Sequence, residues 1–169
     1  MARPQPGTYP AYFQNYVQQV DADSVMEAVE KYGMQVVESF KNIPAEKAGF
    51  RYAEGKWTLK EMLQHIIDTE RIFAYRALTI ARKDETPLPG FDENAYAANS
   101  KADARSWESL LSEFEALRGS TDLMLKSFDA EQLEQAGTTN NNPTTVNAIA
   151  FVVYGHILHH LNIVNERYL

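Results

Sequence analysis

Four histidines are the residues of this sequence best suited to chemistry. They are His65, His156, His159 and His160, in a chain of 169 residues that contains no cysteine. The absence of cysteine excludes disulfides, iron–sulfur clusters and a cysteine nucleophile. A tight transition-metal site must therefore use His, Asp or Glu, and the histidines are its first candidates.

His156 and His160 lie four residues apart on a segment whose apolar spacing predicts a helix. Side chains at i and i+4 are one turn apart on the same helical face, so both imidazoles can bind one ion. Both positions fall within the apolar arc of that helix, whereas His159 falls at its edge and is the weaker candidate. His65 lies at the margin of the apolar stripe of a second predicted helix, where it faces a seam between helices.

A site built from His65, His156 and His160 would leave at least one coordination position for water or substrate, as catalytic sites do. The alternative is that the histidines only pack in the core, although each buried histidine would then need a polar partner. Imidazole binds Zn, Ni, Cu and Fe alike, so the ligands do not select the metal. We expect one divalent transition metal.

Two carboxylates near these histidines are open to more than one interpretation. Glu70 lies near the centre of an apolar helical face, where a carboxylate needs a partner. We favour an ion pair with an arginine such as Arg76 or Arg167 over a role in orienting a metal-bound histidine. Asp92 could reach the mouth of the site, but we expect it to cap a turn. No Ser-His-Asp order or glycine-rich phosphate loop is present, and the sequence identifies no catalytic residue.

Four long segments with helical apolar spacing would position these residues. Ser24 with Glu27, and Thr58 with Glu61, have the spacing of capping boxes. No strands are expected. The predicted helices span residues 24–42, 58–83, 104–128 (capped by Asp103) and 146–168 (capped by Thr144 or Thr145), with a short helical turn over 129–133.

A long connection over residues 84–103 separates the second helix from the third. Extended chain covers about 3.3 Å per residue, so this connection can cross the bundle and leave its flanking helices parallel. We therefore predict an all-α protein, one domain over residues 1–169, built as a four-helix bundle with one long crossover loop. Residues 1–22 form an N-terminal arm with one or two helical turns.

The composition restricts the partners. The formal charge is −7 and no basic run is present, which argues against a nucleic-acid partner. No stretch reaches the roughly 18 apolar residues of a membrane helix, and the N-terminus has no apolar core of a secretory signal. We therefore expect a cytoplasmic protein without a membrane partner.

Two motifs and a loop resemble the DinB-like superfamily, which includes YfiT-type proteins described as metal-dependent hydrolases. The segment 57–70 resembles its first signature, 155–161 resembles its second, a G-H-x-x-H-H pattern, and 87–94 resembles the loop after the second helix. The likeness extends from about residue 24 to the C-terminus. It implies a four-helix bundle in up-down-down-up order.

The resemblance also implies a metal, zinc, nickel or iron, bound by His65, His156 and His160, with His159 as a frequent extra histidine. Relatives include transferases that join low-molecular-weight thiols such as bacillithiol or mycothiol to electrophiles, and a mycothiol-dependent maleylpyruvate isomerase; homodimers are common. It thus implies a metal-dependent hydrolase or thiol-S-transferase acting on a small electrophilic substrate. The alternatives are a non-catalytic metal-binding or stress-associated interaction protein, and a helical dimerisation module whose histidines only pack.

Overall fold

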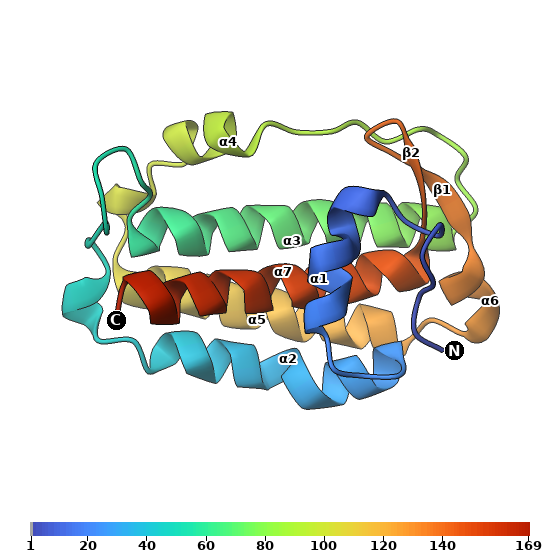
Figure 1. Cartoon of the computed structure of the whole chain (residues 1–169), viewed down its shortest axis with the longest axis horizontal. Coiled ribbons are helices and arrows are strands. Elements are labelled where there is room, and N and C mark those ends of the chain that lie inside the picture. Colours follow the sequence, from blue (N-terminus) through green and yellow to red (C-terminus); the bar gives the residue numbers. More distant parts are fainter. Residues whose placement is uncertain (1) are drawn as a thin grey trace.

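Four long helices lie side by side along the length of the molecule in a computed structural model that describes residues 2–169. They are α2 (Val25–Lys41), α3 (Leu59–Ala81), α5 (Trp107–Lys126) and α7 (Val146–Arg167). The chain colours in Figure 1 show that α2 and α7 run in one direction, and α3 and α5 in the other. This up-down-down-up order confirms the predicted four-helix bundle.

Local capping explains where three of these helices begin. Thr58 and Glu61 form a complete capping box at the start of α3. The hydroxyl of Ser24 accepts a hydrogen bond from the Glu27 amide at the start of α2. Thr145 caps α7 in the same way, so these three starts agree with the sequence prediction.

The predicted start of the third helix at residue 104, with Asp103 as its cap, is wrong. The backbone of Arg105 is extended, and the hydroxyl of Ser106 accepts a hydrogen bond from the Ser109 amide, so α5 begins at Trp107. Asp103 lies in a 3-10 turn (Ala102–Ala104) and accepts a hydrogen bond from the Thr58 hydroxyl at 2.7 Å. It thereby links the end of the crossover to the start of α3.

The crossover runs from the end of α3 to the start of α5, which lie at opposite ends of the bundle (Figure 1). It contains a short helix, α4 (Glu93–Asn99). Asp92 caps this helix, because its carboxylate accepts hydrogen bonds from the amides of Asn94 and Ala95 at 3.0 Å each. The expected capping role of Asp92 is therefore confirmed.

The prediction that the chain has no strands is wrong. After a short helix, α6 (Ala130–Glu134), the strands β1 (Ala136–Thr139) and β2 (Asn142–Thr145) pair antiparallel. Asn140 and Asn141 at the turn have positive φ angles of 49° and 60°, as tight hairpin turns require. The hairpin also binds the crossover, since the Asn140 amide donates to the carbonyl oxygen of Leu88 at 2.9 Å. Because neither strand alternates apolar and polar residues, hydrophobic pattern could not reveal it.

The N-terminal arm folds into a 3-10 turn (Ala11–Phe13) and α1 (Gln14–Gln19), which crosses α7 (Figure 1). Its packing requires a glycine on α7. A Cβ atom at Gly155 would lie 2.1 Å from the carbonyl oxygen of Tyr16. This close approach brings the aromatic side chains of the arm next to the histidines of α7.

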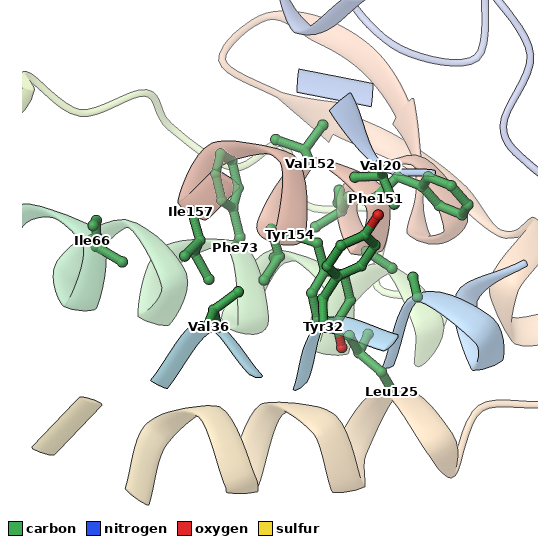
Figure 2. Packing of buried hydrophobic residues seen from close by; sticks show 14 of the residues in the cluster. Val20, Tyr32, Val36, Ile66, Phe73, Leu125, Phe151, Val152, Tyr154 and Ile157 are labelled. Atoms are coloured by element: carbon green, nitrogen blue, oxygen red, sulfur yellow. The ribbon is translucent and has the colours of Figure 1, made fainter. Parts of the chain in front are cut away.

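The core between the helices is apolar and continuous. Figure 2 shows Tyr32 and Val36 of α2, Leu125 of α5, and Tyr154 and Ile157 of α7 among the buried side chains of this core. Within residues 2–169, one helix, α7, is long and apolar enough by composition to span a membrane, although 72% of the relevant window is buried inside the protein. This differs from the sequence expectation, but the core helix of a bundle passes the same test.

One buried ion pair differs from its predicted partners. Glu70 pairs with Arg118 of α5, with Oε1 and Nη1 2.9 Å apart and the side chains 2% and 0% exposed. Arg118 also bonds to Asp122, which accepts a hydrogen bond from the Tyr154 hydroxyl at 2.7 Å. Burial raises the pKa of Glu70, and the guanidinium opposes that rise. The expected ion pair of Glu70 with an arginine is therefore confirmed, but the named partners Arg76 and Arg167 are wrong, because packing of α3 on α5 places Arg118 nearer.

Candidate metal centre

Three imidazole nitrogens from two helices meet at one point in the bundle. The Nε2 atom of His156 lies 3.0 Å from Nε2 of His65 and 3.1 Å from Nε2 of His160. The three ligand atoms all lie within 4.8 Å of one another. The structure thus brings together the three histidines predicted from the sequence, whose role as metal ligands stays a prediction.

These histidines are neutral near pH 7 because they are buried. Their exposed fractions are 8% for His65, 6% for His156 and 8% for His160. Burial lowers the pKa of His65 to about 4, partly opposed by the negative charge of Glu93. Burial also lowers the pKa of His160 to about 3 and that of His156 well below its ordinary value, and the other histidines add to both effects. Neutral imidazole is the form that binds a metal.

The arrangement of the three nitrogens fits a divalent transition metal. Three Nε2 lone pairs that point at one another repel unless a proton or a cation lies between them. A tetrahedral ion with Zn–N bonds of about 2.0 to 2.1 Å separates its nitrogens by about 3.3 Å, close to the spacing of His156 from its two neighbours. Among residues 2–169 no fourth His or carboxylate joins the cluster, so the donor set is that of an open site.

Aromatic packing orients the rings more than hydrogen bonds do. Trp57 packs on His65 with ring centroids 4.8 Å apart, and Tyr16 packs edge-on against His156 at 5.6 Å. The Thr69 hydroxyl lies 3.5 Å from Nδ1 of His65, which is long for a hydrogen bond. Nδ1 of His160 is buried and has no hydrogen-bond partner within the described part of the chain.

His159 does not join the cluster. Its side chain is half-buried and packs on Tyr16 with ring centroids 5.4 Å apart. Burial lowers its pKa to a degree. Its position at the edge of the helical face agrees with its lower rank in the sequence prediction.

A cavity of about 330 Å³ opens beside the three histidines. This size suits a small molecule. Its walls come from the two ligand-bearing helices, the loop before α3, the N-terminal arm, the crossover and the hairpin. Besides the histidines, the lining residues are Tyr12, Phe13, Tyr16, Trp57, Thr69, Phe73, Arg76, Gly90, Phe91, Glu93 and Asn140.

Two charged residues of this cavity were not predicted as site residues. Glu93 is the first residue of α4 and lines the cavity beside the histidines. Burial lowers the pKa of His65, and the negative charge of Glu93 opposes that change. Burial raises the pKa of Tyr16, and the charge of Glu93 adds to the rise. Arg76 was considered only as a partner of Glu70. The one signal that could have indicated Glu93 is its place next to Asp92, at the start of a helix within the long crossover.

Comparison with known proteins gives two similar chains. A protein of Oceanobacillus iheyensis named "Putative metal-dependent hydrolase" is 28% identical over 78 residues, or 46% of this chain and 44% of that protein. The match thus spans under half of the relative's length. The solved structure of YfiT from Bacillus subtilis, described as "a probable metal-dependent hydrolase with an unusual four-helix bundle topology", is 19% identical with a TM-score of 0.69. It covers 96% of this chain and 89% of YfiT, which shows a shared fold.

A family model provides the broader assignment. The model described as the DinB superfamily matches residues 28–164, which include all three clustered histidines and the whole crossover. The match begins after the N-terminal arm, so the aromatic residues of the arm that line the cavity, Tyr12, Phe13 and Tyr16, lie outside it. Because most of the chain is matched, this protein belongs to the DinB superfamily.

Proposed function

We propose that this protein is a metal-dependent enzyme, a hydrolase or a thiol-S-transferase, acting on a small electrophilic substrate. His65, His156 and His160 would hold one divalent transition metal, zinc, nickel or iron, at the inner end of the cavity. The observation that carries this proposal is the convergence of three buried Nε2 atoms on a cavity of small-molecule size. The names of the similar proteins, which refer to metal-dependent hydrolysis, support it.

The chemistry would divide between the metal and the cavity. A divalent ion held by the histidines would supply a Lewis acid that lowers the pKa of a water or a thiol. The carboxylate of Glu93 would accept the proton that this nucleophile loses, since it lines the cavity and its charge affects His65. Phe13, Tyr16 and Trp57 would exclude bulk water from the reacting end.

Two features argue against the non-catalytic alternatives. A structural metal site is closed by a fourth protein ligand, whereas the cluster within residues 2–169 offers three donors and faces a cavity. A module whose histidines only pack would have to satisfy both contacts of the His156 Nε2 atom by hydrogen bonds among the imidazoles, although a neutral ring nitrogen offers only one proton or one lone pair. Both features favour an open metal site.

The experiment is a comparison of three protein samples on one panel of electrophiles. Protein loaded with zinc, nickel or iron, metal-free protein and His160→Ala would be assayed with epoxides, esters and amides, with and without low-molecular-weight thiols. We expect turnover only in the loaded wild-type protein. Turnover that survives metal removal would overturn the mechanism. A homodimeric state and a cytoplasmic location are further predictions, which sedimentation and fractionation would check.

A further inference from the structure

Within residues 2–169, Arg76 is a buried cation without a carboxylate partner. Its side chain is 4% exposed, and it lines the cavity that contains the three histidines. It donates one hydrogen bond, from Nη2 to the carbonyl oxygen of Pro89 at 2.6 Å. Across residues 2–169 it forms no ion pair with a carboxylate, and Glu70 pairs with Arg118 instead. A guanidinium has five N–H donors, so most of its capacity is unused.

The position of Arg76 on α3 relates it to the metal centre. It follows His65 by eleven residues, which is three turns and returns to nearly the same helical face. The two Cα atoms are separated by about 16 Å along the helix axis. Helical side chains lean toward the N-terminus of their helix, and the central carbon of the guanidinium lies 5.6 Å from the ring of Phe73, about one turn closer to His65. Both groups thus face one cavity from positions along its length.

We propose that Arg76 binds an anionic group of the substrate, a carboxylate or a phosphate, while the substrate's reactive centre lies at the histidine cluster. The location of the reactive centre rests on the proposed function; the anion site does not. The substrate class is then an elongated small molecule with an acidic group at one end and an electrophilic centre at the other.

The surroundings of Arg76 suit this role. The Pro89 carbonyl holds one nitrogen of the guanidinium, and the Phe73 ring lies 5.6 Å from its central carbon, which limits the orientation of the group. Burial lowers its pKa, as expected for a cation that has left water without gaining a carboxylate. An anion would compensate this charge and could accept two parallel hydrogen bonds. Arg76 is the one Lys or Arg side chain among the described residues that line the cavity.

The second charged side chain of the cavity does not compensate Arg76. Glu93 belongs to the histidine end, where its charge affects His65, and it forms no ion pair with Arg76 in the described part of the chain. An acidic ligand would therefore bind with its anionic group away from Glu93 and toward Arg76. This gives the cavity a direction, with the cation at one end and the metal ligands with Glu93 at the other.

The test uses metal-free full-length protein, so that an anion cannot bind a metal instead. Isothermal titration calorimetry at pH 7.5 would measure 4-phenylbutanoate, 2-phenylethyl phosphate and the neutral 4-phenylbutanamide. We expect at least one of the two anions to bind about tenfold more tightly than the amide, as charge-assisted hydrogen bonds provide. The tighter anion identifies whether the group is a carboxylate or a phosphate.

Two variants assign that preference to one residue. Arg76→Gln should bind acid and amide equally, and Arg76→Lys should keep a reduced preference because lysine lacks the planar fork. The matched control is Arg71→Gln on the same helix, whose side chain is half-exposed and pairs with Glu113 at 2.6 Å. This control should keep the wild-type preference. If Arg76→Gln does not fold, the wild-type protein and Arg76→Lys still decide the question.

The outcomes separate this proposal from the proposed function. Equal binding of acid and amide by wild-type protein, or a preference retained in Arg76→Gln, would overturn the anion site. Zinc content measured on Arg76→Gln should equal that of wild-type protein, because the three histidines are untouched. A wild-type protein that prefers the anion but binds no metal would overturn the proposed function and leave the anion site standing.

Discussion

The Nε2 atoms of His65 and His156 lie 3.0 Å apart although 91 residues separate them in the sequence. With His160 they form a cluster, and replacing any one of the three histidines should lower the affinity for a metal. We expect His65→Ala, His156→Ala and His160→Ala each to weaken zinc binding by at least about a hundredfold. Competition titration with a chelator would measure it. His159→Ala is the matched control; a loss of binding in that variant alone would contradict the assignment.

The metal-free protein should become less stable as the pH falls below the ordinary histidine pKa of 6.5. The unfolded chain takes up protons there, whereas burial keeps His65 neutral down to about pH 4 and His160 to about pH 3. Because the unfolded state then binds more protons, the free energy of unfolding falls with a slope that approaches about 1.4 kcal/mol per pH unit for each histidine. Urea denaturation between pH 7 and pH 5 would measure the slope, and His65→Gln should reduce it. An unchanged slope in that variant would be inconsistent with the lowered pKa.

Replacing Glu93 should impair chemistry and spare the metal. We expect Glu93→Gln to lower kcat about 100- to 10,000-fold on a substrate found in the panel, because the amide cannot accept a proton. KM and metal content should stay near wild type. Steady-state kinetics and elemental analysis would test this. Glu85→Gln, an exposed position of the same crossover outside the cavity lining, should retain full activity. Full activity in Glu93→Gln would exclude it as the base.

The buried pair of Glu70 and Arg118 should dominate the stability of the polar core. Arg118→Met leaves the Glu70 carboxylate without its cation and should cost about 3 to 5 kcal/mol. Chemical denaturation would measure the loss. Arg71→Met, which breaks a half-exposed pair, should change stability little. Combining Arg118→Met with Glu70→Met should recover part of the loss; a further additive loss would show that the pair was not the cause.

Two glycine substitutions should have opposite effects. Gly155→Ala places a methyl group 2.1 Å from the Tyr16 carbonyl oxygen and must push α1 away from α7, at a cost of about 1 to 3 kcal/mol. Gly119→Ala, in a helix where no atom of another side chain or segment among residues 2–169 lies within 4 Å of the new Cβ, should stabilise by about 0.4 to 1 kcal/mol. Thermal denaturation of the two variants would compare them. A neutral Gly155→Ala would mean that α1 is not held as closely as described.

The parts of the fold that local chemistry determines could be read from the sequence. The capping box of Thr58 and Glu61 places the start of α3 because both hydrogen bonds form within four residues. The spacing of His156 and His160 predicts their shared face because helical geometry alone sets it. The topology required more, namely the length of the crossover together with the family resemblance.

The remaining features depend on contacts between distant segments. Glu70 had several arginines within plausible reach, and only the packing of α3 against α5 selects Arg118. The hairpin lacks apolar alternation. Its formation depends on the turn geometry and on backbone hydrogen bonds to the crossover. Glu93 and Arg76 line the cavity because segments from different parts of the chain surround the same space. A local sequence pattern cannot predict such an arrangement.

The division between bundle and surrounding segments has a consequence for how such a protein can diversify. The three metal-ligating candidates belong to two long helices of the scaffold, whereas Tyr12, Phe13 and Tyr16 come from an arm outside the matched family region. Glu93 comes from the crossover, also outside the four bundle helices. Exchange of the arm would therefore alter which molecules enter while the histidine cluster stays in place, so new substrates could be acquired without rebuilding the cluster, whereas exchange of the crossover would also replace the proposed proton acceptor Glu93.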